Sequence, residues 1–350
     1  MIPVSVLTGF LGSGKTTLLS ALLRHSEMER TAVIVNEFGE IGIDHDLIET
    51  SDESFIQLSN GCLCCNVRSD LVRTLLDLFA RRREGSVPPF ERVVVETSGL
   101  ADPAPILHAL LTDRAVRAHY SIAGIIATVD ALTGSDVLTR YRESVRQIAL
   151  ADCAVVTKTD LPQARPDAVV QAIRSIQPDC PTLYAVRGSI SPSELFAFPR
   201  TSLSEHHVQR YRHHERSTSV LDHRHSSGIG SVAIVREAPV HAATLALFIS
   251  ALAENCGPDV IRMKGIVSVA EMPDSPAVIH GVQHVYHAPR WLSHWPSSDR
   301  CTRIVCIGYG LSGRWIRGTL DVLEDEVAEE TARRSTGAVA ARREPRSRPS

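Results

Sequence analysis

The feature that most constrains this chain is a glycine-rich run near its amino terminus. Residues 9–16 read GFLGSGKT, which fits the phosphate-binding pattern G-x-x-x-x-G-K-[ST]. An apolar, strand-like stretch at residues 4–8 precedes the run, and a helix-forming stretch at 17–23 follows it. Because the motif has the strand, loop and helix context that it requires, the sequence predicts a nucleotide-binding P-loop.

Each residue type in this run has a physical task. Glycines let the loop curl so that backbone N–H groups point at phosphates, Lys15 places a charge on the β and γ oxygens, and Thr16 offers a hydroxyl to Mg²⁺. The residues predicted to bind the nucleotide here are Gly9, Gly12, Ser13, Gly14, Lys15, Thr16 and Thr17.

Composition narrows the class of protein. The chain has 350 residues, of which 43% are hydrophobic, so it can bury the cores of two domains, and its net charge of −3 does not favour nucleic acid or an anionic membrane. The first strand begins too early to leave room for a signal peptide, and no apolar run approaches membrane-spanning length. We therefore expect a cytoplasmic protein with no nucleic-acid or membrane partner, and a cluster among its eight cysteines would indicate metal or redox work.

Apolar strands alternate with helical segments in the first part of the chain. The expected strands are residues 4–8, 31–36, 92–96, 122–130, 153–157 and 182–186. This alternation predicts an α/β fold, namely the parallel sheet of a P-loop NTPase with helices on both faces, followed by a smaller α+β domain. The expected division is a nucleotide domain at 1–198, a His/Arg/Ser-rich linker at 199–229, the second domain at 230–328 and a disordered basic tail at 329–350.

A second phosphate-site element lies at residues 93–99, which read VVVETSG. Glu96 at the end of this apolar strand can hold Mg²⁺ through water, and the Gly99 N–H can meet the γ-phosphate. The alternative is a strand that merely ends in an acid.

The run TKTD at residues 157–160 resembles the guanine-reading N-K-x-D element. Asp160 can accept two hydrogen bonds from guanine, whereas adenine would leave the carboxylate unpaired, so GTP is preferred over ATP. Lys158 matches the element and Thr157 replaces its asparagine, which could loosen affinity or selectivity. The alternative is a polar turn after a strand.

Because no nucleophile or general-base triad is evident, we expect slow GTP hydrolysis that depends on Lys15, Thr16 and Glu96.

Three cysteines lie within four residues in the run GCLCC at 61–65. Cys62, Cys64 and Cys65 could offer three thiolates to a metal ion such as Zn²⁺, and thiolates also accept Co²⁺. A closed structural zinc site has four protein ligands, so the fourth position is left to Glu40, a histidine, water or a ligand from another protein. The alternative is a small apolar patch.

Together these runs resemble the CobW-like family of P-loop GTPases. The matching segments are GFLGSGKTT at 9–17, NEFGE-x-GID at 36–44, NGCLCC at 60–65, ETSGLADP at 96–103, TKTDL at 157–161, RMKG at 262–265, GVQ at 281–283 and the strand at 303–308. The resemblance implies a GTPase that binds zinc or cobalt through Cys62, Cys64 and Cys65. It also implies delivery of the metal to a client metalloprotein or a cobalt-insertion complex.

Two other readings stay open at this stage. One is a metal sensor or buffer that uses the nucleotide as a structural ligand, and the other is a P-loop kinase acting on a small molecule. Six histidines in the linker could collect metal weakly, although interspersed arginines would repel a cation. The six histidines are His206, His207, His213, His214, His223 and His225.

Residues 36–44 and 60–65 both precede the Glu96 strand, so we expect GTP and metal affinities to be linked.

Overall fold

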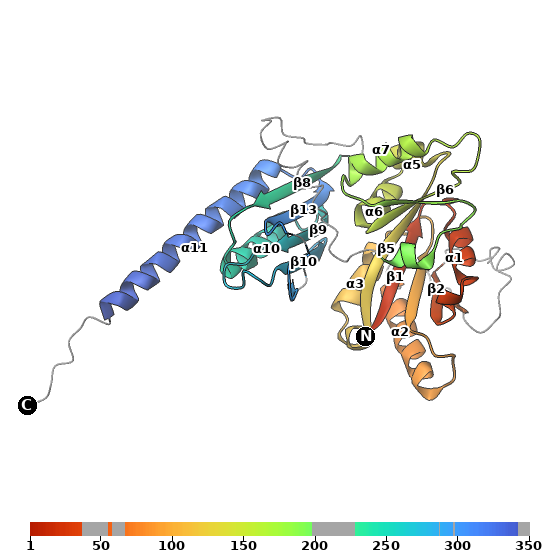
Figure 1. The fold of residues 1–350 in the computed structure, drawn as a ribbon, viewed down its shortest axis with the longest axis horizontal. Coiled ribbons are helices and arrows are strands. Elements are labelled where there is room, and N and C mark those ends of the chain that lie inside the picture. The colour runs from red at the N-terminus through yellow and green to blue at the C-terminus, as the bar shows by residue number, and fades with distance from the viewer. Residues whose placement is uncertain (37–54, 58–66, 198–227, 287, 297, 342–350) are drawn as a thin grey trace, which may run out of the picture.

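The structure is a computed structural model that describes residues 1–36, 55–57, 67–197, 228–286, 288–296 and 298–341. Its amino-terminal part is a seven-stranded sheet with the order β3-β2-β4-β1-β5-β6-β7 (Figure 1). All neighbouring strands are parallel. The strands are β1 (Ile2–Gly9), β2 (Thr31–Asn36), β3 (Phe55–Gln57), β4 (Arg92–Thr97), β5 (Tyr120–Asp130), β6 (Cys153–Thr157) and β7 (Thr182–Ala185). Their carboxyl ends therefore share one edge of the sheet, where ligands of such folds bind.

Helices cover both faces of this sheet. One core contains apolar side chains of α2 (Val67–Glu84), α3 (Ala104–Thr112), α4 (Arg114–His119), α5 (Gly134–Arg140), α6 (Arg142–Leu150) and α7 (Pro166–Ile176). A separate core contains those of α1 (Lys15–Leu23), the 3₁₀ helix η1 (Ser26–Met28) and α8 (Pro192–Phe196). Along β1, Val4 and Val6 face the first core and Leu7 faces the second. This alternation explains why β1 has apolar side chains on both of its faces.

The second sheet is antiparallel and has the order β11-β10-β9-β13-β8, with β12 also pairing with β10. Its strands are β8 (Ile229–Arg236), β9 (Val260–Val267), β10 (Ala277–Val282), β11 (Val285–Tyr286), β12 (Arg290–Trp291) and β13 (Thr302–Tyr309). Helices α10 (Ala242–Cys256) and α11 (Gly313–Ala341) pack against one face of this sheet. The expected fold class, a P-loop parallel sheet followed by a smaller α+β unit, is confirmed.

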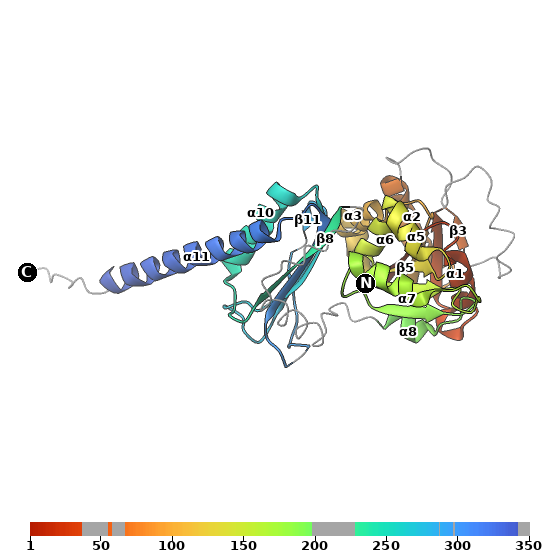
Figure 2. The ribbon, with the colours of Figure 1, turned by 90° about the horizontal axis from the view of Figure 1, so that it is seen from above.

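The opposite face of the second sheet joins the first sheet's core (Figure 2). Ile261, Val282 and Ile307 belong to the same buried cluster as the side chains of α3 and α6. Beside this apolar contact, Asp152 at the start of β6 accepts hydrogen bonds from Arg262, at 2.5 Å, and from Lys264, both on β9. The two sheets are thus joined by a buried apolar contact with an ionic cluster at its side.

The prediction of a disordered basic tail at 329–350 is partly wrong. Helix α11 continues to Ala341 and projects away from both sheets (Figure 1). Residues 329–341 contain four alanines and no proline, which favours a helix although Gly337 lies among them, and the side chain of Glu329 pairs with that of Arg333 at 3.3 Å. The other predicted domain boundaries stay predictions, because residues 198–227 and 342–350 lie outside the described residues.

None of the helices in the described part of the chain combines the length and the apolar character needed to cross a bilayer.

Candidate nucleotide site

The predicted P-loop connects β1 to α1 at the centre of the first sheet. Gly9, Gly12 and Gly14 have φ angles of 144°, 70° and 90°, a region that favours glycine. At Gly9 an added Cβ would lie only 2.3 Å from the hydroxyl oxygen of Thr128, so close packing also requires glycine there. The loop ends at the amino terminus of α1, where free N–H groups and the helix dipole favour an anion.

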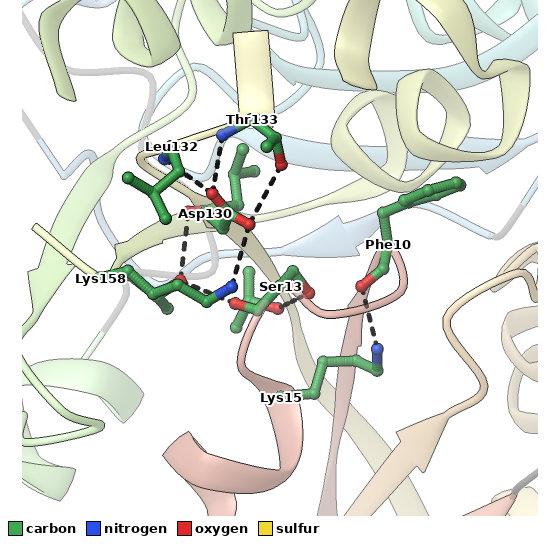
Figure 3. A network of polar contacts seen from close by, with 10 residues as sticks. Phe10, Ser13, Lys15, Asp130, Leu132, Thr133 and Lys158 are labelled. Atoms are coloured by element: carbon green, nitrogen blue, oxygen red, sulfur yellow. Dashed lines mark hydrogen bonds and ion pairs between the residues drawn. The ribbon is translucent and has the colours of Figure 1, made fainter. Parts of the chain in front are cut away.

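Lys15 lies against the loop that it ends. Its ammonium donates to the carbonyl oxygens of Gly9, at 2.9 Å, and Phe10, at 3.2 Å. Figure 3 shows the bond to Phe10. The side chain is buried, so its positive charge is held close to the loop with little freedom to move away. This arrangement keeps a cation beside the anion-binding end of α1.

Thr16 and Glu96 meet at the same edge of the sheet. Thr16 is the second residue of α1, and its hydroxyl donates to the Glu96 Oε1 atom at 2.8 Å. Glu96 lies near the end of β4, the neighbour of β1, and is almost completely buried. A hydroxyl and a carboxylate are oxygen donors of the kind that Mg²⁺ prefers, so the donor set fits this ion.

Gly99 packs directly against the P-loop. A Cβ at this position would lie 2.7 Å from the backbone nitrogen of Leu11, so a larger residue would push the two segments apart. The buried side chain of Gln147 on α6 donates to the carbonyl oxygens of Gly99, at 3.2 Å, and Ala101, at 3.1 Å. Gln147 was not foreseen, because nothing in the sequence relates α6 to this turn.

The predicted guanine-reading element lies at the end of β6, on the opposite side of β1 from β4. The Thr157 hydroxyl donates to the backbone oxygen of Ser13 at 2.7 Å and so joins this element to the P-loop. Asp160 lies 3.6 Å from the guanidinium of Arg187, which follows β7. Arg187 has a φ of 51° and is exposed, and no motif in the sequence pointed to it.

Asp130, at the end of β5, links several of these segments (Figure 3). Its carboxylate accepts from the Lys158 ammonium at 3.0 Å and from the backbone N–H groups of Leu132 and Thr133 at 2.7 and 2.9 Å. Burial alone would raise the pKa of Asp130, but these hydrogen bonds and the Lys158 charge outweigh it and hold the pKa below its usual value. Asp130 was missed, although an acid at the end of an apolar strand is the signal that identified Glu96.

The predicted residues therefore fall into two groups. The phosphate and guanine residues, from Gly9 to Thr17 and at Glu96, Gly99, Thr157, Lys158 and Asp160, lie along one edge of the sheet, and their roles stay predictions. The predicted metal ligands Glu40, Cys62, Cys64 and Cys65, and the six linker histidines, lie outside the described residues. Within the described residues, no three His, Cys, Asp or Glu side chains converge as a metal site would require.

Two families match the sequence over most of its length. A family described as "CobW/HypB/UreG, nucleotide-binding domain" matches residues 3–183, and one described as "Cobalamin synthesis protein cobW C-terminal domain" matches residues 229–324. The chain is 30% identical to the zinc chaperone YjiA of Escherichia coli (strain K12), over 90% of this chain and 96% of the relative. It is 34% identical to the zinc-regulated GTPase metalloprotein activator 1 of Schizosaccharomyces pombe, over 49% of this chain and 42% of that relative.

A solved structure shares the arrangement of both sheets. The crystal structure of a Zn(II)-bound triple mutant of the YjiA GTPase superposes with a TM-score of 0.69 and 25% identity. The superposition covers 92% of this chain and 99% of that one. The similarity therefore extends beyond the nucleotide-binding sheet to the second unit.

Proposed function

The chain belongs to the CobW/HypB/UreG family of metal-handling nucleotide-binding proteins, and from this premise we propose that it is a GTP-hydrolysing metallochaperone. It would bind a divalent metal ion, zinc or else cobalt, at Cys62, Cys64 and Cys65 and pass it to a client metalloprotein or a cobalt-insertion complex in the cytoplasm. The observation that carries the nucleotide part of the proposal is the contact of Thr16 with Glu96 beside the P-loop, because a P-loop hydroxyl and an acid on the neighbouring strand hold the Mg²⁺ of a bound nucleotide in P-loop NTPases.

Hydrolysis would depend on positioning and charge rather than on covalent chemistry. The amino terminus of α1 and the buried Lys15 ammonium would bind the phosphates and stabilise the charge that develops on the γ-phosphoryl group. Thr16 and Glu96 would hold Mg²⁺, which would supply positive charge to offset that of the phosphate groups. Gly99, packed on Leu11 of the P-loop, would place its N–H near the γ-phosphate. Turnover without a built-in general base should be slow.

Base selection would fall to the loop after β6. Asp160 would accept from the ring N–H and the exocyclic amine of guanine, and adenine cannot supply this pair of donors. Thr157 stands where the guanine element has asparagine, yet its hydroxyl ties the loop to Ser13 of the P-loop. This bond supports guanine recognition in spite of the substitution.

The path of the chain supports a metal site close to the nucleotide. In the sheet, Leu7 pairs with Glu96, Glu96 with Val35, and Val35 with Gln57, so these residues form one row across four strands. Two strand spacings separate Glu96 from Gln57, or about 10 Å. Cys62 lies five residues after Gln57 in the sequence, and β2 ends at Asn36, which pairs with Thr97 next to Glu96.

This arrangement gives a physical route for coupling. Segments that leave the sheet beside the γ-phosphate position are those that switch proteins order and release during the nucleotide cycle. If GTP orders the stretch between β2 and α2, the geometry of the three thiolates and of Glu40 changes with it. Binding of GTP and binding of metal would then be linked reciprocally.

Replacing Cys64 and Cys65 together by serine should abolish tight metal binding, because one remaining thiolate cannot hold zinc or cobalt. Protein purified without added metal and then supplied with zinc should bind about one ion per chain, whereas the double variant should bind well under a tenth as much when measured by elemental analysis. Cys256→Ser, which alters a half-buried thiol of the second unit, is the matched control and should bind metal normally. Undiminished metal in the double variant would refute the assigned ligands.

GTP turnover measured on the same samples separates the remaining functions. Hydrolysis to GDP and phosphate supports the proposal, whereas transfer of the γ-phosphoryl group to a small molecule would establish a kinase. Tight metal binding with no turnover would establish a sensor or buffer that uses the nucleotide only as a structural ligand.

A further inference from the structure

The loop that would read guanine has a backbone conformation that needs external support. Lys158 has a φ of 56°, in the left-handed region that residues other than glycine rarely adopt. Such a conformation costs free energy and persists only where surrounding contacts enforce it. The contacts made by Thr157 and Lys158 therefore decide how firmly Asp160, two residues further on, is placed.

Asp130 supplies the contact to Lys158. Its two carboxylate oxygens have different partners. Oδ1 accepts from the backbone N–H groups of Leu132 and Thr133, while Oδ2 accepts from the Lys158 ammonium at 3.0 Å and from the Thr133 hydroxyl at 3.1 Å. The Asp130 side chain is 10% exposed and that of Lys158 is 36% exposed, so water screens this pair only in part. One oxygen thus fixes the turn after β5 and the other holds Lys158.

Thr157 supplies the other contact. Its hydroxyl bonds to the Ser13 carbonyl oxygen, and its own carbonyl oxygen accepts from the Ala131 N–H at 2.9 Å. The loop after β6 is therefore tied to the P-loop on one side and to the turn that follows Asp130 on the other. Both contacts use buried or partly buried polar groups. Removing the partner of such a group costs more free energy than removing the partner of an exposed one.

We propose that Asp130 is a positioning residue for guanine recognition, which acts through Lys158 to fix the loop that carries Asp160. The inference rests on the proposed function, in that Asp160 must read guanine. It assigns to Asp130 a role that the motif itself does not contain. Because recognition by two hydrogen bonds depends on accurate placement of the carboxylate, a loosened loop should bind guanine less tightly and discriminate less.

Asp130→Asn tests this role with little change in shape. The asparagine oxygen can still accept from Leu132 and Thr133, but its amide group cannot pair with the Lys158 ammonium. We expect the Kd for GTP to rise about tenfold and the Kd for ITP, which lacks the exocyclic amine, to rise less, so that the ratio of the GTP affinity to the ITP affinity (the GTP/ITP ratio) falls. KM should rise while kcat changes less than about threefold, since phosphate contacts are unaltered. Asp136→Asn, at an exposed acid on α5, is the matched control and should leave the GTP/ITP ratio, KM and kcat unchanged.

A double-mutant cycle with Lys158→Met distinguishes positioning through Lys158 from a general structural effect. If Asp130 acts through Lys158, the double variant should bind GTP no more weakly than Lys158→Met alone, and additive losses would overturn the inference. Thr157→Val should lower the GTP/ITP ratio in the same way, whereas Thr157→Ser keeps the hydroxyl and should retain it. Should Asp130→Asn not fold, Lys158→Met alone decides, because Asp130 is inferred to act through Lys158: an unchanged GTP/ITP ratio in Lys158→Met overturns the inference.

The outcomes separate this inference from the proposed function. A wild-type protein that binds GTP and ITP equally would remove guanine reading itself, and with it the role of Asp130. A wild type that prefers GTP, together with an Asp130→Asn variant that keeps the same preference, would overturn the positioning role alone.

Discussion

Lys15→Ala should reduce GTP turnover by about 100- to 1,000-fold, the loss typical when one preorganised charge-stabilising donor is removed from an active site. The effect has two sources. The variant lacks the cation that would stabilise developing charge on the phosphoryl group, and it also frees the Gly9 and Phe10 carbonyl oxygens that the ammonium holds. The readout is phosphate release under saturating GTP, with nucleotide affinity measured by calorimetry.

The control for this experiment is Arg24→Ala. Arg24 is an exposed cation just after the last residue of α1, so its removal changes the net charge of the protein by the same amount without touching the P-loop. Turnover of the control should match that of the wild type. If Lys15→Ala were folded by circular dichroism and hydrolysed GTP at the wild-type rate, the assignment of the P-loop as the hydrolytic site would be wrong.

Asp152→Asn should lower the free energy of unfolding by about 3 kcal/mol, the low end of the range for removing one partner of a buried ion pair. Asp152 accepts from Arg262 and Lys264 across the junction of the two sheets and from the Ile125 N–H within the first. All three charged side chains are less than a quarter exposed, so the two cations would lose their counter-charge where water cannot replace it. Urea unfolding, followed by circular dichroism, measures the change.

Asp274→Asn is the control, because the Asp274–Arg300 pair is largely exposed and should contribute less than about 1 kcal/mol.

The dependence of stability on acidic pH provides a second measurement. Burial alone would raise the pKa of Asp152, but Arg262 and Lys264 hold that pKa well below its usual range. The folded state thus prefers the ionised form. The stabilisation is present above the unfolded pKa of about 4 and is lost as pH falls towards the folded value. Wild type should therefore lose more stability than Asp152→Asn below about pH 4. Equal urea midpoints at neutral pH would refute the cluster's role.

The sequence was most informative where one local pattern fixes both structure and chemistry. The P-loop needs glycines at fixed offsets between a strand and a helix, so Gly9, Gly14 and Lys15 could be placed without knowledge of the fold. The alternation of apolar strands with helical segments indicated a parallel sheet with helices on both faces. Because parallel strands end at one edge, Glu96 and Asp160 were expected near the P-loop, although they lie far apart in the chain.

Contacts between segments that are distant in the chain could not be predicted from the sequence. Asp152 and Arg262 are 110 positions apart, and no periodicity or motif pairs them. The bond from Thr157 to Ser13 depends on the depth at which α1 packs against β6, which spacing does not reveal. The helical part of the tail was missed for a different reason: a high density of arginine suggested disorder, whereas α11 continues to Ala341 through a stretch that contains four alanines and no proline.

The central proposal, that the nucleotide site and the three-cysteine site respond to each other, is tested most directly by zinc affinity measured with a non-hydrolysable GTP analogue and with GDP. We expect the two zinc Kd values to differ by about 5- to 150-fold, the usual range of allosteric coupling, and the GTP analogue to show the same factor when its affinity is measured with and without zinc. Equal zinc affinities in the two nucleotide states would contradict the proposal.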